Sequence, residues 1–184
     1  MRELSLNIMD IAQNSVRAQA TKIVIRCAQN TAAQTLTLEV EDNGKGMSAE
    51  QIAAVTDPFF TTRTTRKVGL GVPLFKMAAE QTGGSFKITS EPGAGTLTAA
   101  TFRIDSVDMT PLGDIGSTVS LLIHSNPDMD IVFERSVDEK SFTLDTAQMR
   151  EMLGDVPLNH PEVALWINSF LQENEKDLFG GNDQ

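Results

Sequence analysis

Hydrophobic positions change their spacing several times along the first 104 residues. Leu4, Ile8 and Ile11 recur at the period of one helix face, whereas Leu36 and Leu38 belong to an alternating run that indicates a strand. The predicted elements are a helix over 3–20, strands near 22–27 and 36–41, a helix beginning at a Ser48–Gln51 capping box, a loop over 56–70, a helix over 72–81, and strands near 85–90 and 96–104.

The order of these elements predicts the fold class. Successive strands without a crossover helix between them form hairpins, so the sheet is expected to be mixed and mainly antiparallel. The helices then gather on one face of that sheet. We therefore expect an α+β protein, a two-layer α/β sandwich, rather than a doubly wound fold.

Residues 105–184 are interpreted as a separate C-terminal extension, which divides the chain into parts 1–104 and 105–184. The pattern predicts a helix over 114–124, a hairpin pairing 131–135 with 142–144, a short helix ending at Gly154, and an amphipathic helix over 161–171. Trp166 lies on the apolar stripe of the last helix and is expected in the core, whereas the residues from Glu173 are expected to fray. The extension is expected to pack on the open face of the sheet, or else to form a partner surface.

Charge divides the chain at the same place. Residues 1–104 hold nine acidic and eleven basic side chains, a net charge of +2, whereas residues 105–184 hold sixteen and four, a net charge of −12. Binding to nucleic acid or to anionic lipid is therefore not expected, because both need an excess of Lys and Arg on one face. The single cysteine excludes an intrachain disulfide, and no apolar run is long enough to span a membrane. A soluble cytoplasmic protein is expected.

Two glycine-containing segments are candidates for ligand binding. The turn 42–46 follows a strand, and the carboxylate of Asp42 there can accept a hydrogen bond from the exocyclic amine of adenine, while its glycines leave room for a flat ligand. Gly69-Leu70-Gly71 offers free backbone N–H groups at a helix start, where phosphates bind readily. The basic residues before it, Arg63, Arg66 and Lys67, can then contact those phosphates. Each segment alone is equally consistent with an ordinary turn or loop.

A third candidate lies on the first predicted helix. Asp10, Asn14 and Arg17 share one face at positions i, i+4 and i+7. The amide oxygen of Asn14 is a hard ligand suited to Mg²⁺ beside phosphate oxygens, and the carboxylate of Asp10 can orient or deprotonate an attacking group. The alternative is a helix face exposed to solvent.

Taken together and in order, five segments resemble the sequence boxes of the GHKL family, which includes histidine kinases, the DNA gyrase B subunit, the heat-shock ATPase chaperone and the mismatch-repair ATPases. The segments are DIAQNSVR at 10–17, DNGKGM at 42–47, DPFFTTR at 57–63, GLG at 69–71 with Lys76 five residues on, and Gly95-Thr96. They are most similar to the boxes of histidine kinase catalytic domains. The resemblance covers residues 3–104.

This resemblance implies the Bergerat ATP-binding fold, with residues 56–70 as the ATP lid. It implies that Asn14 ligates Mg²⁺, that Asp42 reads adenine, and that Thr96 supports the hydrogen bonds on the adenine side. Arg17 stands where histidine kinases carry a lysine that contacts phosphate. The implied nucleotide-binding residues are Asn14, Arg17, Asp42, Gly44, Gly46, Met47, Phe59, Thr61, Thr62, Arg63, Lys67, Gly69, Leu70, Gly71, Val72, Lys76 and Thr96.

Two features depart from the family pattern. Asp10 stands where the hydrolysing members carry a glutamate, and its shorter side chain has less reach towards an attacking water. No helical hairpin with a phosphoacceptor histidine precedes the first box, so a complete sensor histidine kinase is not expected. The histidines, His124 and His160, follow the boxes and are expected to cap or pack.

Three functions remain open on this basis. The first is a stand-alone, histidine-kinase-like regulatory enzyme that phosphorylates a partner protein or slowly hydrolyses ATP, with Asp10 as the catalytic base. The second is a non-catalytic, ATP-gated protein-binding module, and the third is a scaffold that binds no nucleotide. The expected ligands are ATP and Mg²⁺. The expected partner is a protein held by residues 105–184, with a homodimer as an open alternative.

Overall fold

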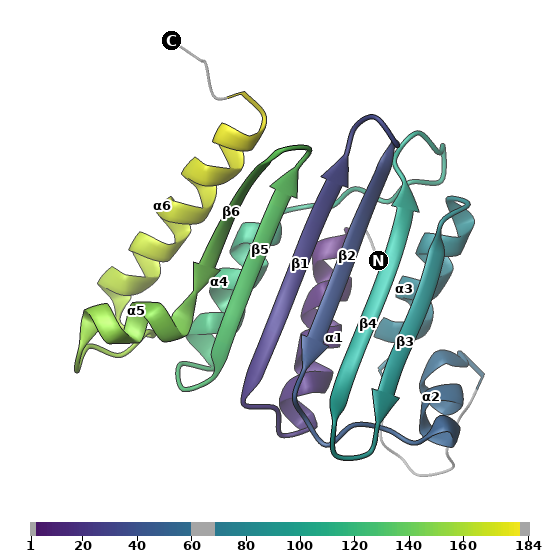
Figure 1. Ribbon diagram of the computed structural model, residues 1–184, viewed down its shortest axis with the longest axis horizontal. Coiled ribbons are helices and arrows are strands. Elements are labelled where there is room, and N and C mark those ends of the chain that lie inside the picture. Colours follow the sequence, from purple (N-terminus) through teal and green to yellow (C-terminus); the bar gives the residue numbers. More distant parts are fainter. Residues whose placement is uncertain (1–2, 60–68, 181–184) are drawn as a thin grey trace.

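A computed structural model describes residues 3–59 and 69–180 of the chain. The strands in this part form one sheet in the order β3-β4-β2-β1-β5-β6 (Figure 1). The strands are β1 (Lys22–Asn30), β2 (Thr35–Asp42), β3 (Ser85–Glu91), β4 (Gly95–Arg103), β5 (Asp130–Val137) and β6 (Lys140–Asp145). The helices are α1 (Leu4–Arg17), α2 (Ala49–Thr56), α3 (Gly71–Gln81), α4 (Ile115–Ser125), α5 (Thr146–Leu153) and α6 (Pro161–Leu178).

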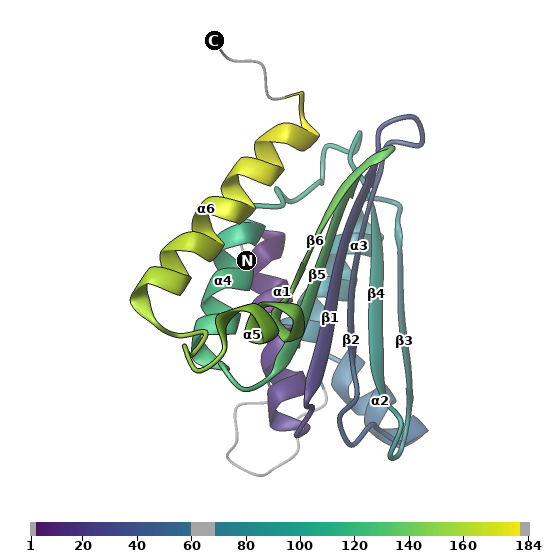
Figure 2. The same ribbon diagram turned by 60° about the vertical axis from the view of Figure 1, so that its left-hand side comes forward.

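The helices α1, α3 and α4 cover one face of the sheet, and α6 packs against α4 in the same layer (Figure 2). Neighbouring strands run antiparallel except β1 and β5, which are parallel. Among the described residues, the opposite face of the sheet carries no helix (Figure 2). The predicted two-layer α+β sandwich with a mixed, mainly antiparallel sheet is therefore confirmed.

Alternation along the strands separates the two faces of the sheet. On β1, Ile23, Ile25 and Cys27 are fully buried beneath the helices, and the intervening Arg26 lies on the opposite face. The guanidinium of Arg26 bonds Glu39 of β2 at 3.4 Å, Glu41 of β2 at 2.8 Å and Glu134 of β5 at 3.1 Å. One cation thus links three neighbouring strands on the face without helices.

The C-terminal part extends the sheet of the first part. Strand β5 pairs in parallel with β1, and buried side chains face each other, such as Ile25 and Phe133. The segment before α4 also caps α1, because the backbone N–H groups of Leu4 and Ser5 donate to the carbonyls of Pro111 and Leu112, both at 2.9 Å. These bonds satisfy two N–H groups that have no partner within the helix. The division into parts 1–104 and 105–184 stays a prediction.

Three expectations for α6 are wrong. The residues from Glu173 do not fray, since the helix continues to Leu178. The guanidinium of Arg135, only 1% exposed, holds them by donating to both carboxylate oxygens of Glu175, at 2.8 and 3.0 Å. Trp166 is 49% exposed rather than buried in the core. The helix lies beside α4 instead of on the open face, because β5 and β6 extend the sheet and carry the helix layer with them.

The two histidines differ in their surroundings. The side chain of His160 caps α6 by accepting a bond from the backbone N–H of Glu162, as the sequence predicts. His124 is exposed in the last turn of α4. None of the helices within residues 3–59 and 69–180 is long and apolar enough to cross a membrane.

The reactivity of the single cysteine can report on local opening of the sheet. Cys27 lies in β1 opposite Arg135 of β5 and is completely buried. Burial raises the pKa of its thiol to about 12. Because only the thiolate is nucleophilic, thiol reagents are expected to reach Cys27 through opening of the β1–β5 region.

Candidate nucleotide-binding site

The motif residues meet at a cavity of about 220 Å³ between α1, the turn after β2 and the start of α3. The residues predicted from sequence that line it are Asn14, Arg17, Asp42, Gly46, Met47, Gly69, Val72 and Thr96. They come from segments up to 82 positions apart in the chain, and the sheet topology brings them together. Apolar side chains of Ile11, Val55, Val72 and Ile88 complete the wall and suit a flat ring.

The carboxylate of Asp42 has a fixed orientation at the end of β2. Its Oδ2 accepts a 2.6 Å hydrogen bond from the hydroxyl of Ser15, and its Oδ1 accepts a 2.8 Å bond from the backbone N–H of Gly44. Thr96 lies directly opposite Asp42 in the β2–β4 register. Such bonds hold the carboxylate in one orientation for a ligand donor, and they leave further lone pairs free to accept.

Ser90 organises the other side of the same cavity, although it belongs to none of the five sequence boxes. Its hydroxyl lies 2.8 Å from the hydroxyl of Thr96 and donates to the carbonyl of Gly95 at 2.8 Å. The same oxygen accepts a 2.8 Å bond from the backbone N–H of Met47. One serine thus joins the turn 42–47 to the hairpin of β3 and β4, and it orients the hydroxyl of Thr96.

The two glycines of the turn are required because neighbouring backbone leaves no room for a side chain at either position. Gly46 has φ +69°, and a Cβ atom there would lie 1.9 Å from the carbonyl oxygen of Glu91. A Cβ atom on Gly44 would lie 2.8 Å from the carbonyl oxygen of Ala18 at the end of α1. The absent side chains therefore let the turn approach both the β3–β4 hairpin and the helix that carries Asn14.

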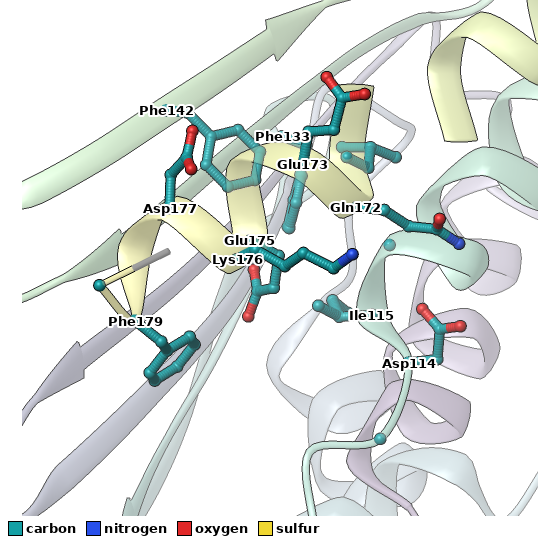
Figure 3. Close-up of a pocket in the computed structure, with 14 residues that line it drawn as sticks. Asp114, Ile115, Phe133, Phe142, Gln172, Glu173, Glu175, Lys176, Asp177 and Phe179 are labelled. Carbon is teal, nitrogen blue, oxygen red and sulfur yellow. The ribbon is translucent and has the colours of Figure 1, made fainter. Parts of the chain in front are cut away.

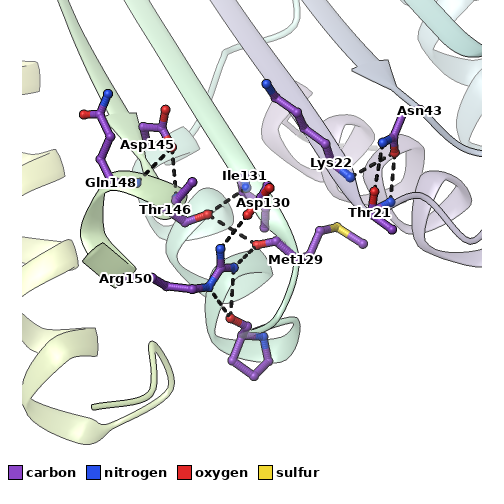
Figure 4. Close-up of polar contacts among 12 residues, drawn as sticks. Thr21, Lys22, Asn43, Met129, Asp130, Ile131, Asp145, Thr146, Gln148 and Arg150 are labelled. Carbon is purple, nitrogen blue, oxygen red and sulfur yellow. Dashed lines mark hydrogen bonds and ion pairs between the residues drawn. The ribbon is translucent and has the colours of Figure 1, made fainter. Parts of the chain in front are cut away.

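Asn43 anchors the same turn to the start of β1 (Figure 4). Its amide oxygen accepts from the backbone N–H groups of Thr21 and Lys22, at 2.8 and 2.9 Å, and its amide nitrogen donates to the hydroxyl of Thr21 at 2.8 Å. The same view shows Arg150 of α5 bonded to Asp130, next to the point where the backbone N–H of Asp130 donates to the carbonyl of Thr21. Bonds from the C-terminal part therefore reach the residues that hold the turn.

On α1, Asn14 and Asp10 lie one turn apart in different surroundings. The amide oxygen of Asn14 accepts a 3.0 Å bond from the guanidinium of Arg17. Asp10 is exposed and lies against the first residue of α3, since a Cβ atom on Gly71 would approach the Cβ of Asp10 to 2.7 Å. Among the residues that the structure describes, Asp10 is not part of the cavity lining.

The other predicted residues lie around or beyond the cavity. Gly44, Leu70, Gly71 and Lys76 are close to it in the chain but do not line it, and Phe59 is 88% exposed. Thr61, Thr62, Arg63 and Lys67 lie outside the described residues, as does Arg66. The lining residues that sequence reasoning missed are Ile11, Ser15, Ala18, Lys45, Val55, Ile88 and Thr98. Most of these are apolar or small, and their pattern in the sequence is that of an ordinary core.

A larger cavity of about 810 Å³ lies elsewhere, between the start of α4 and the end of α6 (Figure 3). Asp114, Glu173, Glu175 and Asp177 surround it together with Phe133, Phe142 and Phe179 (Figure 3). None of its lining residues belongs to the five sequence boxes. Its four carboxylates outnumber its one lysine, Lys176, and disfavour a phosphate ligand, so the smaller cavity is the better candidate for a nucleotide.

Metal binding would depend on the ligand as well as on the protein. Within residues 3–59 and 69–180 there is no group of three or more His, Cys, Asp or Glu side chains placed to hold a metal ion. An amide oxygen such as that of Asn14 can complete the coordination of Mg²⁺ when phosphates supply the other oxygens. The donor chemistry therefore fits a metal that arrives with a nucleotide.

A mixed sheet covered on one face, with ordered motif residues around a cavity beside α1, places the chain in the class of GHKL-type α+β sandwiches. A family model described as "Histidine kinase-, DNA gyrase B-, and HSP90-like ATPase" matches residues 2–107, more than half of the 184 residues. The chain belongs to that family.

Similar proteins agree with this assignment. The sensor histidine kinase ZraS of Escherichia coli is 29% identical over 89 residues, which cover 48% of this chain and 19% of that protein. The sensor protein kinase FleS of Pseudomonas aeruginosa is 32% identical over 109 residues, which cover 59% of this chain and 26% of that protein. The matched region thus spans about a fifth to a quarter of these relatives. A crystal structure of the N-terminal domain of a DNA repair protein shares the fold, with a TM-score of 0.55 at 12% identity, covering 98% of this chain and 57% of that one.

Proposed function

We propose that the chain binds ATP with Mg²⁺ in the 220 Å³ cavity, and that it transfers the γ-phosphate to a protein partner or slowly hydrolyses ATP. The observation that carries this proposal is the carboxylate of Asp42, which Ser15 and Gly44 hold opposite Thr96. An ionised carboxylate accepts hydrogen bonds and donates none. It suits the exocyclic amine of adenine and repels the carbonyl that guanine presents at the same position.

The phosphates would lie between α1 and the start of α3. Gly69 and Val72 line the cavity there, and the free N–H groups at the N-terminus of α3 favour an anion. Arg17 can exchange its bond to Asn14 for a phosphate oxygen, which frees the amide oxygen of Asn14 for the metal. Mg²⁺ bound in this way would offset the charge of the phosphates.

Asp10 decides between catalysis and binding alone. One turn before Asn14, its carboxylate would orient or deprotonate the group that attacks the γ-phosphate. Its exposure, and its place against Gly71 outside the cavity lining, favour a second candidate function, in which ATP gates a protein-binding surface without turnover. Both candidates need the adenine site, so the first experiment measures binding and the second measures turnover.

Asp42→Asn is expected to weaken ATP binding about 10- to 150-fold, because a hydrogen bond to a charged group contributes about 1.5–3 kcal/mol. The substitution keeps the size of the side chain, and the hydroxyl of Ser15 can turn to accept from the new amide nitrogen. Titration calorimetry with ATP and Mg²⁺ measures the dissociation constant. Asp128→Asn, in the exposed turn before β5, is the matched control and should bind like the native chain. Equal affinity of all three proteins would contradict the role of Asp42.

Asp10→Asn separates the two candidates. If Asp10 is a catalytic base, the release or transfer of label from γ-labelled ATP falls about 100-fold or more. The affinity for ATP should change little, since Asp10 lies outside the cavity lining among the described residues. Unchanged turnover in Asp10→Asn would instead support the ATP-gated module, and the Asp128→Asn protein again serves as the control.

A further inference from the structure

An apolar groove lies at the opposite end of the sheet from the nucleotide cavity. It has a volume of about 670 Å³ and runs between α5, the loop 154–160 and the first turns of α6. Met152 is 78% exposed there and Trp166 is 49% exposed, although both are large apolar side chains. Val156 adds to the same surface. Large apolar side chains that gather on a surface in this way mark interaction sites.

The groove is formed by side chains suited to binding. Trp166 stacks on Phe170 with ring centroids 5.2 Å apart and planes 19° apart, so its ring is held in place. Met149 and Met152 line the wall on α5 and can adapt their shape to different apolar partners. A fixed aromatic anchor beside flexible methionines is typical of surfaces that accept an apolar helix face.

Acidic groups border the groove, and no Lys or Arg is among the described residues that line it. Asp155 and Glu162 line it, and Glu151 is exposed on α5 beside it. Arg150 is the only Lys or Arg between positions 149 and 166, and His160, which also lines the groove, accepts a bond from the backbone N–H of Glu162. The guanidinium of Arg150 bonds Asp130 and donates to the carbonyl of Pro127 at 3.1 Å, so it is engaged away from the groove (Figure 4). The rim therefore favours a basic partner.

This charge argues against two other occupants. A second copy of the chain placed by a two-fold axis would bring one acidic rim against another, which costs free energy. An anionic membrane surface would be repelled for the same reason. A helix with apolar residues on one face and Lys or Arg beside them satisfies both the groove and its rim.

We propose that the groove between α5 and α6 binds an amphipathic, basic helix of a partner protein. Apolar side chains of that helix contact Met152, Val156 and Trp166, and its flanking cations face Asp155 and Glu162. The groove is lined by α5, the loop 154–160 and α6, whereas the nucleotide cavity adjoins β2 and β4 and shares no lining residue with it, so this binding does not depend on the proposed ATP site.

The chain contains its own probe for this proposal. Trp166 is the only tryptophan and the sequence has no tyrosine, so tryptophan emission reports on the groove alone. The full chain is titrated, without nucleotide, with a synthetic helical peptide of Leu, Ala, Lys and Arg that lacks Trp and Tyr. Its emission should shift to shorter wavelength as the ring leaves water, and the affinity should fall as salt is raised. A peptide with Glu in place of Lys and Arg should not bind.

Variants of the chain test the same contacts. Met152→Glu should weaken binding of the basic peptide about tenfold or more, and the double variant Asp155→Asn, Glu162→Gln should remove most of the salt dependence. Met77→Glu, an exposed methionine on α3, is the matched control and should bind like the native chain.

Three results would overturn the proposal. The first is equal binding of the acidic and the basic peptide, which would show a groove without charge selection. The second is a self-association that Met152→Glu abolishes, which would identify a second copy as the occupant. The third is emission of Trp166 that neither peptide changes. Because the titration contains no ATP, any of these results leaves the proposed nucleotide function unaffected.

Discussion

Alanine at position 46 is expected to lower the free energy of unfolding by about 3 kcal/mol or more. A left-handed conformation alone costs a residue with a Cβ atom about 1–2 kcal/mol, and Gly46 has φ +69°. The new Cβ would also lie 1.9 Å from the carbonyl oxygen of Glu91, which is backbone and cannot rotate away. The turn 42–47 and the β3–β4 hairpin must therefore separate, and the bond between Met47 and Ser90 is lost with them.

Gly93→Ala is the matched control for this prediction. Gly93 lies in the hairpin that Gly46 contacts and has φ +82°, but a Cβ atom there meets nothing within 4 Å. It should lose about 1–2 kcal/mol, so thermal unfolding should shift by roughly 2–8 °C, against roughly 6–12 °C for Gly46→Ala. Equal shifts for the two variants would mean that conformation alone, and not the close approach to Glu91, requires glycine at position 46.

The local elements were predictable because their signals are local. The Ser48–Gln51 capping box forms with both of its bonds, at 2.9 and 3.3 Å. The period of α1 correctly buries Leu4, Ile8 and Ile11, and the helix is three residues shorter than predicted at its C-terminal end. A period identifies the buried face of an element, and a cap identifies its first residue.

The partners of each element were not predictable in the same way. The alternation of apolar and polar residues in β5 does not indicate that β5 pairs in parallel with β1. Strand pairing depends on which edge strand of the sheet is available in three dimensions. The end of α6 was misjudged because Glu175 has a polar sequence neighbourhood, whereas its partner Arg135 lies 40 positions earlier. Trp166 is expected in the core because it belongs to the apolar stripe of α6. In the structure it lines the groove beside α5, and its ring is therefore half exposed.

For the candidate site, the order of the motifs along the chain identified binding residues that no single motif could have identified by itself. Asp42 and Asn14 were predicted from their place in the boxes, and both line one cavity. Ser15 and Ser90 were not predicted as ligand-binding residues, because no sequence pattern marks a serine whose role is to orient another side chain. Their contacts with Asp42 and Thr96 depend on the register between α1, β2, β3 and β4, which the sequence pattern does not specify.

Deleting residues 105–184 is expected to abolish cooperative folding of the remaining chain. The deletion leaves β1 as an unpaired edge from Lys22 to Gln29 and removes the carbonyls of Pro111 and Leu112 that cap α1. Ile23 and Ile25 lose the neighbours Ile131 and Phe133. Each apolar side chain that becomes exposed costs about 1.5–3 kcal/mol, against a total stability of about 5–15 kcal/mol for a typical domain. Residues 1–104, which contain the sequence boxes of the family, would then require residues 105–184 in order to fold.

Cys27 supplies the measurement, because it lies on β1 directly beside β5 and no other thiol competes. In the full chain its buried thiol, with a pKa raised to about 12, should react slowly with a disulfide reagent and at the rate of opening. In the fragment 1–104 it should react about as fast as in the urea-unfolded chain. Removing only residues 181–184 is the control, because it takes away no bond that the described structure contains, and protection should persist. If fragment 1–104 protects Cys27 and melts in one sharp transition, then the boundary at residue 104 separates two units that fold independently.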